Sequence, residues 1–329
     1  MKYQKPSKFK LPKIELKNIK LKHIILGCFV VVMLFTSLFV GKMAKTYVYY
    51  NRTKDLYSAN IIDYSHFKPF RNWKISDLQD LTARSAISIV ANGKDTVVYE
   101  LNKDRIVPIA SLTKLMTAYV VLDNYLLDDI IVITQEAVDV PELSGTLTAG
   151  EQIKVKDLLY SMLVESSNDA AYALAADMGM DDFIFEMNRT AKKLELDYTH
   201  FVNPIGLDPE FEILSHNYST AYDLGLLAHR ILDDKPEIFE MTRNEEVDLY
   251  YADGRFHHKA KNTNAILDNY PTMLGGKTGT TNMAGQCLLV IMPQPKHQGG
   301  YIINVILGST NRFSDMEKIL NWQTKAFIW

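Results

Sequence analysis

The pair Ser111 and Lys114 has the residue types and the spacing of a nucleophile and its base. Apolar side chains recur at helical spacing over residues 112–122, so the pair lies at the start of a buried helix. A three-residue separation places the hydroxyl and the amine on one helix face. Because burial disfavours a charged amine, Lys114 could accept the proton of Ser111 and activate it for covalent catalysis. The same spacing recurs at Ser7–Lys10 and Ser65–Lys68, and a capping serine with an outward lysine is the alternative.

A second candidate group interrupts an apolar helix. Ser166, Ser167 and Asn168 stand in a row within a segment that otherwise has a helical pattern from Asp157 to Met178. Burying polar groups without partners is costly, so we expect these three to face a cleft. Ser-x-Asn occurs three more times in the chain, and a helix junction with Ser and Asn caps is the alternative.

A third candidate, Lys-Thr-Gly, occurs once. It runs from Lys277 to Gly279 and is followed by Thr280. A lysine amine with threonine hydroxyls at a strand edge suits a carboxylate ligand. Gly279 has no side chain, so another backbone could approach it closely, as in strand addition. A turn before an edge strand is the alternative.

The three groups occur in this order within one region, and the set is that of penicillin-binding proteins and class A β-lactamases. The sequence segments that contain or accompany these motifs make the resemblance more specific. They are Pro108–Thr117, Ser167–Ala171, Thr199–Leu207, Tyr218–Leu224 and Lys277–Thr280. In these segments the chain closely resembles the serine-type D-alanyl-D-alanine carboxypeptidases, and the resemblance runs from about residue 82 to its end. These are the low-molecular-mass penicillin-binding proteins of peptidase family S11.

The resemblance implies a role for each matched residue. Ser111 would be the acylated nucleophile, Lys114 its base and Ser166 a proton relay. The substrate-binding residues it implies are Asn168, Lys277, Thr278, Gly279 and Thr280. The backbone N–H groups of Ser111 and Thr280 would form the oxyanion hole. The implied partners are the peptidoglycan stem peptide and β-lactam antibiotics, which would acylate the same serine, and neither a metal nor an organic cofactor is implied.

Other functions fit parts of the pattern. A D,D-endopeptidase would share the whole site and differ in loops that select cross-linked stems. A class A β-lactamase needs a Glu-x-x-x-Asn pattern, which occurs here at Glu240–Asn244, too far downstream. A non-catalytic wall-binding homologue is disfavoured by the intact set. A zinc peptidase is disfavoured because the chain lacks the His-Glu-x-x-His motif. We expect His257 and His258 to lie in a solvated loop.

Strand patterns stand at both ends of this region, with helix patterns between them. Residues 86–90 and 96–99 predict a hairpin, and strands return from Gly275, at 285–292 and at 301–307. The predicted helices cover 112–122, 157–178, 181–194, 219–232 and 314–322. This order predicts an α/β (α+β) fold of the β-lactamase/transpeptidase type. Its antiparallel sheet, with paired terminal strands, is flanked by helices and carries an inserted all-helical lobe.

The amino-terminal segment has a different character. Residues 1–23 carry eight lysines against Glu15 alone, a net charge of +7, and residues 24–41 form an 18-residue run without charge. That length just spans a bilayer core of ~30 Å, and the lysines would keep their side in the cytoplasm. A cleaved signal peptide and a buried core helix are the alternatives. We predict a cytoplasmic tail (1–23), a transmembrane signal-anchor (24–41), a stalk (42–81) and a catalytic domain (82–329) on the extracytoplasmic face.

Charge and composition narrow the partners. The chain has 329 residues and a net charge of −3, so the part after residue 23 carries −10, which disfavours a nucleic-acid partner. Only two cysteines occur, and Cys28 lies inside the apolar run. Cys287 is therefore left without an obvious partner, and no disulfide is predicted. The lysine-rich tail could also bind anionic lipid headgroups, although orientation of the anchor is its simpler role.

Overall fold

The computed structural model describes residues 69–91, 95–141, 146–208, 216–296 and 300–329, which all belong to one structural unit. The predicted tail, the predicted transmembrane segment and most of the predicted stalk lie outside these residues. Among the described residues, no helix has both the length and the apolar character needed to cross a membrane.

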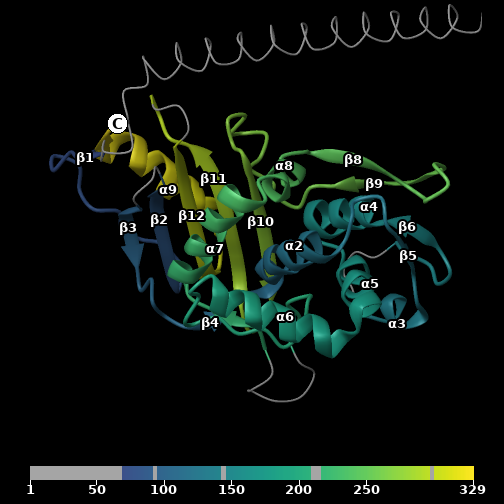
Figure 1. The fold of residues 1–329 in the computed structure, drawn as a ribbon. Helices are drawn as coiled ribbons and strands as arrows, with labels where there is room; N and C mark the ends of the chain where they lie inside the picture. The colour runs from purple at the N-terminus through teal and green to yellow at the C-terminus, as the bar shows by residue number, and fades with distance from the viewer. Residues whose placement is uncertain (1–68, 92–94, 142–145, 209–215, 297–299) are drawn as a thin grey trace, which may run out of the picture. The chain divides into compact units, whose positions relative to one another are not determined.

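A five-stranded antiparallel sheet forms the centre of this unit (Figure 1). Its strands, in spatial order, are β10 (Gly275–Thr281), β11 (Gly285–Pro293), β12 (Tyr301–Ser309), β2 (Ser85–Ala91) and β3 (Thr96–Leu101). β12 and β2 are neighbours, with Ile303 opposite Ile89, so the strands from the two ends of the region pair as predicted. β10 ends the sheet on one side, so one of its edges has no strand partner among the described residues.

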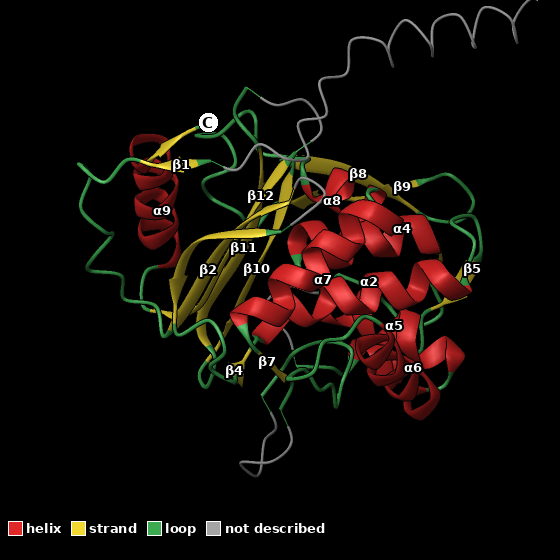
Figure 2. Cartoon of the chain, turned by 60° about the vertical axis from the view of Figure 1, so that its left-hand side comes forward, coloured by secondary structure: helices red, strands yellow, loops and turns green. Residues whose placement is uncertain are grey.

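Helices cover both faces of the sheet (Figure 2). Both faces of the sheet are apolar and need a cover. In the strand β11, for example, the buried side chains point alternately into two cores, one on each face. Leu288 and Val290 pack with α9 (Arg312–Ala326), whereas Leu289 and Ile291 belong to the larger core on the other face. There α7 (Ala221–Asp234) lies close to β2, and a Cβ on Gly225 would come within 2.6 Å of the Ile89 side chain.

The remaining helices form the predicted all-helical lobe beside β10. They are α2 (Thr113–Asn124), α3 (Gln135–Val138), α4 (Val155–Tyr160), the π-helical η3 (Ser161–Glu165), α5 (Asn168–Met178), α6 (Met180–Lys193) and α8 (Glu237–Thr242). Short strand pairs border them, namely β5 (Ile130–Val132) with β6 (Gln152–Lys154), β8 (Glu246–Tyr250) with β9 (Phe256–Lys261), and β4 (Val107–Pro108) with β7 (Tyr218–Ser219). The predicted helix over 157–178 is interrupted at Ser166 and Ser167, as expected.

The end of the predicted stalk, residues 69–81, includes the part around Trp73 that was expected to be ordered, and it packs against the catalytic region. β1 (Phe70–Arg71) pairs with β13 (Phe327–Ile328), which directly follows α9. The indole of Trp322 donates to the carbonyl of Ser76 at 2.9 Å. A two-residue strand is too short to show a hydrophobic period, so no sequence pattern predicts this pairing.

Candidate active site

Ser111 lies in the 3₁₀ turn η2 (Ala110–Leu112), immediately before α2. The preceding residue, Ala110, has φ of +49°, a left-handed conformation that non-glycine residues adopt rarely. The chain at Gly206 passes close to this turn, because a Cβ on Gly206 would lie 2.0 Å from the Ala110 carbonyl oxygen. Thr113 also donates to that oxygen at 2.8 Å. The turn presents Ser111 to the cleft in a fixed geometry.

Lys114 lies one turn further along and is fully buried. Its Nζ is 3.0 Å from the Oγ of Ser111 and 2.7 Å from the Oδ1 of Asn168. A buried amine needs such partners, since an unpaired one is costly. The predicted base is therefore within hydrogen-bonding distance of the predicted nucleophile, as proton transfer requires.

Ser166 and Asn168 come from the break between η3 and α5. Ser166 has φ of +68°, a left-handed conformation that ends η3. Ser167 then caps α5 by accepting from the N–H of Ala170. Asn168, the first residue of α5, accepts from Lys114 and donates to the carbonyl of Pro141 at 3.1 Å. The helix is broken where Ser166 and Asn168 reach the cleft, whereas Ser167, also expected to face it, is buried and does not line it.

Lys277 enters from β10, on the opposite wall. Its side chain is 1% exposed, and its Nζ donates to Ser166 Oγ at 2.8 Å and to the carbonyl of Thr278 at 3.0 Å. Burial, together with the positive charges of Lys114 and Arg312, holds the pKa of Lys277 well below the usual lysine value. An arriving carboxylate would relieve that penalty, so the group is suited to bind an anion.

β10 also passes close to the nucleophile. A Cβ placed on Gly279 would lie 2.8 Å from the backbone nitrogen of Ser111 and 3.0 Å from the Cβ of Ala110. Only glycine fits at this distance from the turn, while the expected addition of a ligand strand at Gly279 stays a prediction. The backbone of Ser111 and the free edge of β10 therefore border the same space.

That space is a cleft of about 400 Å³. Its lining residues are Ser111, Pro141, Glu165, Ser166, Asn168, Leu207, Thr263, Thr278, Gly279, Thr280 and Arg312. All eight predicted site residues meet here, because six line the cleft and the two buried lysines bond directly to residues that line it. Among the described residues, no group of three or more His, Cys, Asp or Glu side chains is placed to hold a metal ion.

Sequence reasoning missed Arg312. This residue begins α9 and donates from Nη1 to the carbonyl of Gly279 at 2.8 Å and to the hydroxyl of Thr280. Burial lowers the pKa of Arg312 below its usual value. The guanidinium adds a second cation to the wall expected to bind a carboxylate. No motif marks this arginine, because it reaches the cleft through the position of α9 beside the sheet.

The expectation for His257 and His258 was wrong. Both lie on the strand β9, and each imidazole faces a carboxylate. Nε2 of His257 is 3.1 Å from Glu151, and Nε2 of His258 is 2.9 Å from Glu165. The side chains are only 6% and 18% exposed. Glu165 also accepts from Ser161 at 2.6 Å. The acidic partners come from distant parts of the chain, so a polar sequence context did not reveal them.

The sequence profile of the D-alanyl-D-alanine carboxypeptidase family matches residues 72–311. The chain belongs to this family. The match confirms the resemblance carried by the three motifs, and it extends about ten residues before the predicted start of the catalytic domain.

Two curated relatives and one solved structure illustrate the similarity. The chain is 32% identical to a D-alanyl-D-alanine endopeptidase of Pseudomonas aeruginosa, covering 74% of this chain and 78% of that protein. It is 34% identical to the D-alanyl-D-alanine carboxypeptidase DacC of Escherichia coli, covering 72% and 60% respectively. Penicillin-binding protein D2 of Listeria monocytogenes, solved in its ampicillin-bound form, superposes with a TM-score of 0.62 at 31% identity, covering 75% and 99%. The predicted α+β transpeptidase-like fold is thereby confirmed.

Proposed function

We propose that this protein is a serine-type D-alanyl-D-alanine carboxypeptidase that removes the terminal D-alanine from peptidoglycan stem pentapeptides. The observation that carries the proposal is the position of Lys114, whose amine bonds both Ser111 and Asn168. Lys277, on the facing wall, and Ser166, at the helix break, supply a second amine–hydroxyl pair. These two pairs provide a base, a nucleophile, a proton relay and a carboxylate receptor within one cleft.

The reaction follows from this arrangement. Lys114 takes the proton of Ser111, and the Oγ attacks the carbonyl carbon of the D-alanyl-D-alanine bond. Backbone N–H groups of Ser111 and Thr280 stabilise the negative oxygen. The C–N bond then breaks, the leaving amine receives a proton through Ser166, and D-alanine departs. Water hydrolyses the ester on Ser111, which releases the shortened peptide as a carboxylic acid and regenerates the hydroxyl.

Of the rival functions, the class A β-lactamase has less support. Glu240 and Asn244, which carry the matching spacing, are both exposed and lie outside the residues that line the cleft.

The endopeptidase shares every site residue, and a relative bears that name. Mass spectrometry on a pentapeptide stem and on a cross-linked dimer separates the two activities. Loss of one alanine from the free stem supports the proposal, whereas cleavage of the dimer alone contradicts it.

Covalent labelling tests the nucleophile. A fluorescent penicillin should mark the wild-type protein and leave Ser111→Ala unmarked. Ser314→Ala is the matched control, because this serine lies on α9 outside the cleft lining and should label normally. Labelling of Ser111→Ala at the wild-type rate would show that another serine is acylated.

The proposal includes a membrane anchor formed by residues 24–41, with the catalytic domain outside the cytoplasm. The uncharged run of 18 residues and the preceding lysines support it. An uncleaved anchor predicts that the protein stays in the membrane pellet after alkaline extraction. It also predicts that added protease digests the catalytic domain on intact spheroplasts. Release by alkali at full mass contradicts the anchor.

A further inference from the structure

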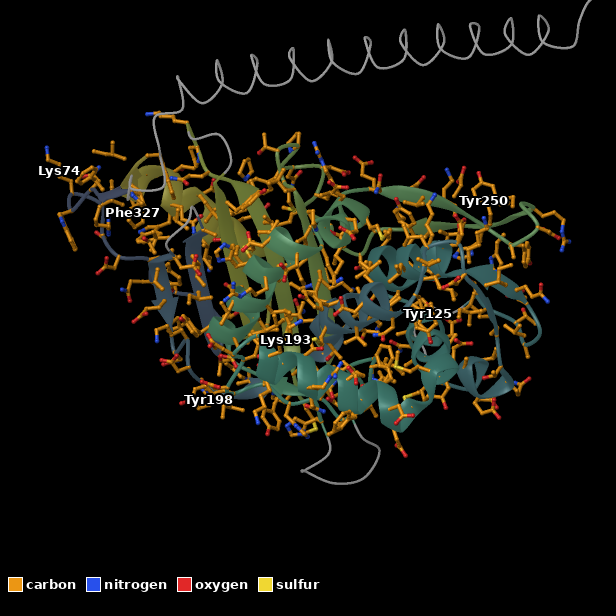
Figure 3. All side chains as sticks on the ribbon, in the orientation of Figure 1. Lys74, Tyr125, Lys193, Tyr198, Tyr250 and Phe327 are labelled. Carbon is orange, nitrogen blue, oxygen red and sulfur yellow. The ribbon has the colours of Figure 1, made fainter. Side chains whose placement is uncertain are left out.

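Thr263 lines the catalytic cleft but belongs to none of the three motifs. It follows β9, which runs from the end of the molecule marked by Tyr250 back toward β10 (Figure 1 and Figure 3). Its backbone N–H donates to the carbonyl of Val164 at 3.1 Å, and its Oγ1 lies 2.5 Å from the Oγ1 of Thr278. This one residue therefore connects the helix η3 with the strand β10 across the cleft.

The backbone around Thr263 is fixed on both sides. The preceding residue, Asn262, donates from Nδ2 to the carbonyls of Thr242 and Asn244, each at 2.8 Å. Its Oδ1 accepts from the N–H of Asn264 at 2.9 Å, which is an Asx turn that spans Thr263. The hydroxyl of Thr263 is thus presented to the cleft from a well-held turn.

The partner hydroxyl, that of Thr278, is in a confined position. Thr278 is 4% exposed, and Thr263 is the hydrogen-bond partner of its hydroxyl among the residues that the structure describes. A hydroxyl carries one proton and two acceptor lone pairs, so only one of the two oxygens can donate across their short contact. The direction of that donation decides whether the proton of Thr278 is available to a ligand.

A carboxylate ligand selects one direction. An ionised carboxylate only accepts hydrogen bonds, so the hydroxyl of Thr278 can bind it only by donating its own proton. The oxygen of Thr278 then accepts from Thr263, and successive bonds in such a chain polarise and strengthen one another. Lys277 does not compete for this hydroxyl, because its Nζ donates to the backbone carbonyl of Thr278.

We propose that Thr263 is a positioning residue for carboxylate capture, whose hydroxyl donates to Thr278 and so directs the proton of Thr278 toward the terminal carboxylate of the stem peptide. Thr263 acts through Thr278 and touches no reacting atom. The inference rests on the proposed function, from which the carboxylate ligand is taken. It assigns a role to the turn at residues 262–264, which none of the motifs includes.

Thr263→Val tests this role, because valine has the shape of threonine without the hydroxyl. Benzylpenicillin carries a carboxylate, whereas its methyl ester masks that charge. We expect Thr263→Val to lower the second-order rate of acylation by benzylpenicillin about fivefold to tenfold, and the rate with the ester by less than about twofold. With a pentapeptide stem, KM should rise while kcat stays nearly constant, which is the signature of lost binding. Thr263→Ser restores the hydroxyl and should restore both rates.

A double-mutant cycle shows whether Thr263 acts through Thr278. In the Thr278→Val background, Thr263→Val should cause no further loss of acylation by benzylpenicillin, because the proton it directs is already absent. Losses that add in the double variant overturn the inference. Thr324→Val is the matched control, since the hydroxyl of Thr324 donates within α9 and lies outside the cleft lining, and its rate should equal that of wild type.

Two further outcomes separate this inference from the proposed function. A wild-type rate in folded Thr263→Val, or equal losses with benzylpenicillin and its ester, overturns the role of Thr263 alone. Wild-type protein that penicillin acylates but that releases no D-alanine from a pentapeptide overturns the proposed function, while the comparison of penicillin with its ester still decides the role of Thr263.

Discussion

Lys277 donates a hydrogen bond of 2.8 Å to the hydroxyl of Ser166, although 111 residues separate them. The bond joins the free edge of the sheet to the broken helix of the lobe. Because Ser166 lies between the two walls, the same hydroxyl can pass a proton toward the leaving group while Lys277 holds the substrate carboxylate. This relationship makes the cleft one reaction site rather than two adjoining surfaces.

Replacing Asn168 with Asp tests whether the neighbouring amine of Lys114 acts as the base. The new carboxylate would lie about 2.7 Å from Lys114 Nζ and favour its charged form, which cannot accept a proton. We expect acylation by penicillin at neutral pH to slow by roughly 10²-fold, with partial recovery at higher pH. Asn244→Asp makes the same change at an exposed site and should leave the rate unchanged. An unaltered rate in Asn168→Asp would remove Lys114 from its assigned role.

Gly279→Ala tests the close approach of β10 to the nucleophile. The added Cβ would meet the Ser111 nitrogen at 2.8 Å, so either the strand or the turn must move. A displacement of this size is expected to lower kcat/KM by roughly 10²-fold. Stopped-flow acylation gives the rate, and the thermal midpoint of the same sample shows whether the fold is retained. A folded variant with the wild-type rate would contradict the proposed geometry.

The lowered pKa of Lys277 predicts a pH dependence of substrate capture. Above that pKa the amine is neutral and no longer attracts a carboxylate, so kcat/KM should fall at a pH below the usual lysine value of 10.5. A stem peptide ending in a carboxamide lacks the attracted charge and should show a weaker fall. Other titrating groups affect both substrates alike, so the difference between the two pH profiles isolates the effect of Lys277 on carboxylate binding. Parallel profiles would argue against Lys277 as the carboxylate receptor.

Arg312→Gln should weaken the use of substrates that end in a carboxylate. A hydrogen bond to a charged group contributes ~1.5–3 kcal/mol, which corresponds to a loss of about 10- to 150-fold in kcat/KM. Arg255, exposed and paired with Asp253, offers the control Arg255→Gln. We expect a carboxamide-terminated peptide to be little affected by either change. Equal losses for both peptides would point to a structural effect of α9.

His229 predicts a stability that depends on pH. Its hydrogen bond to Asp95 raises the pKa of His229 above the usual value of 6.5. A raised folded-state pKa gives stabilisation that is complete below the unfolded value and disappears as pH rises through the folded value. The free energy of unfolding of wild type should therefore exceed that of His229→Gln most below about pH 6 and least near pH 9. Urea titrations across this range measure the difference, and a constant gap would contradict the ion pair.

The sequence alone determined the local parts of this protein. The motifs at Ser111, Ser166 and Lys277 were recognisable because each needs a particular local backbone, namely a first helical turn, a helix break and an edge strand. The long helices were predicted because burial of one face imposes a period on many consecutive residues, and the strands because short apolar runs stand beside turn signals. The missing side chain of Gly279 indicated that another backbone could come close, although not that the turn of Ser111 would do so.

Only the tertiary structure decided which distant residues meet. Arg312 reaches the cleft because α9 starts beside the end of β10, and His258 faces Glu165 because β9 packs against the broken helix. β1 and β13 pair over two residues each, too few for any period. Such contacts depend on strand order and helix placement, which the summed packing of the whole core fixes and no local pattern encodes.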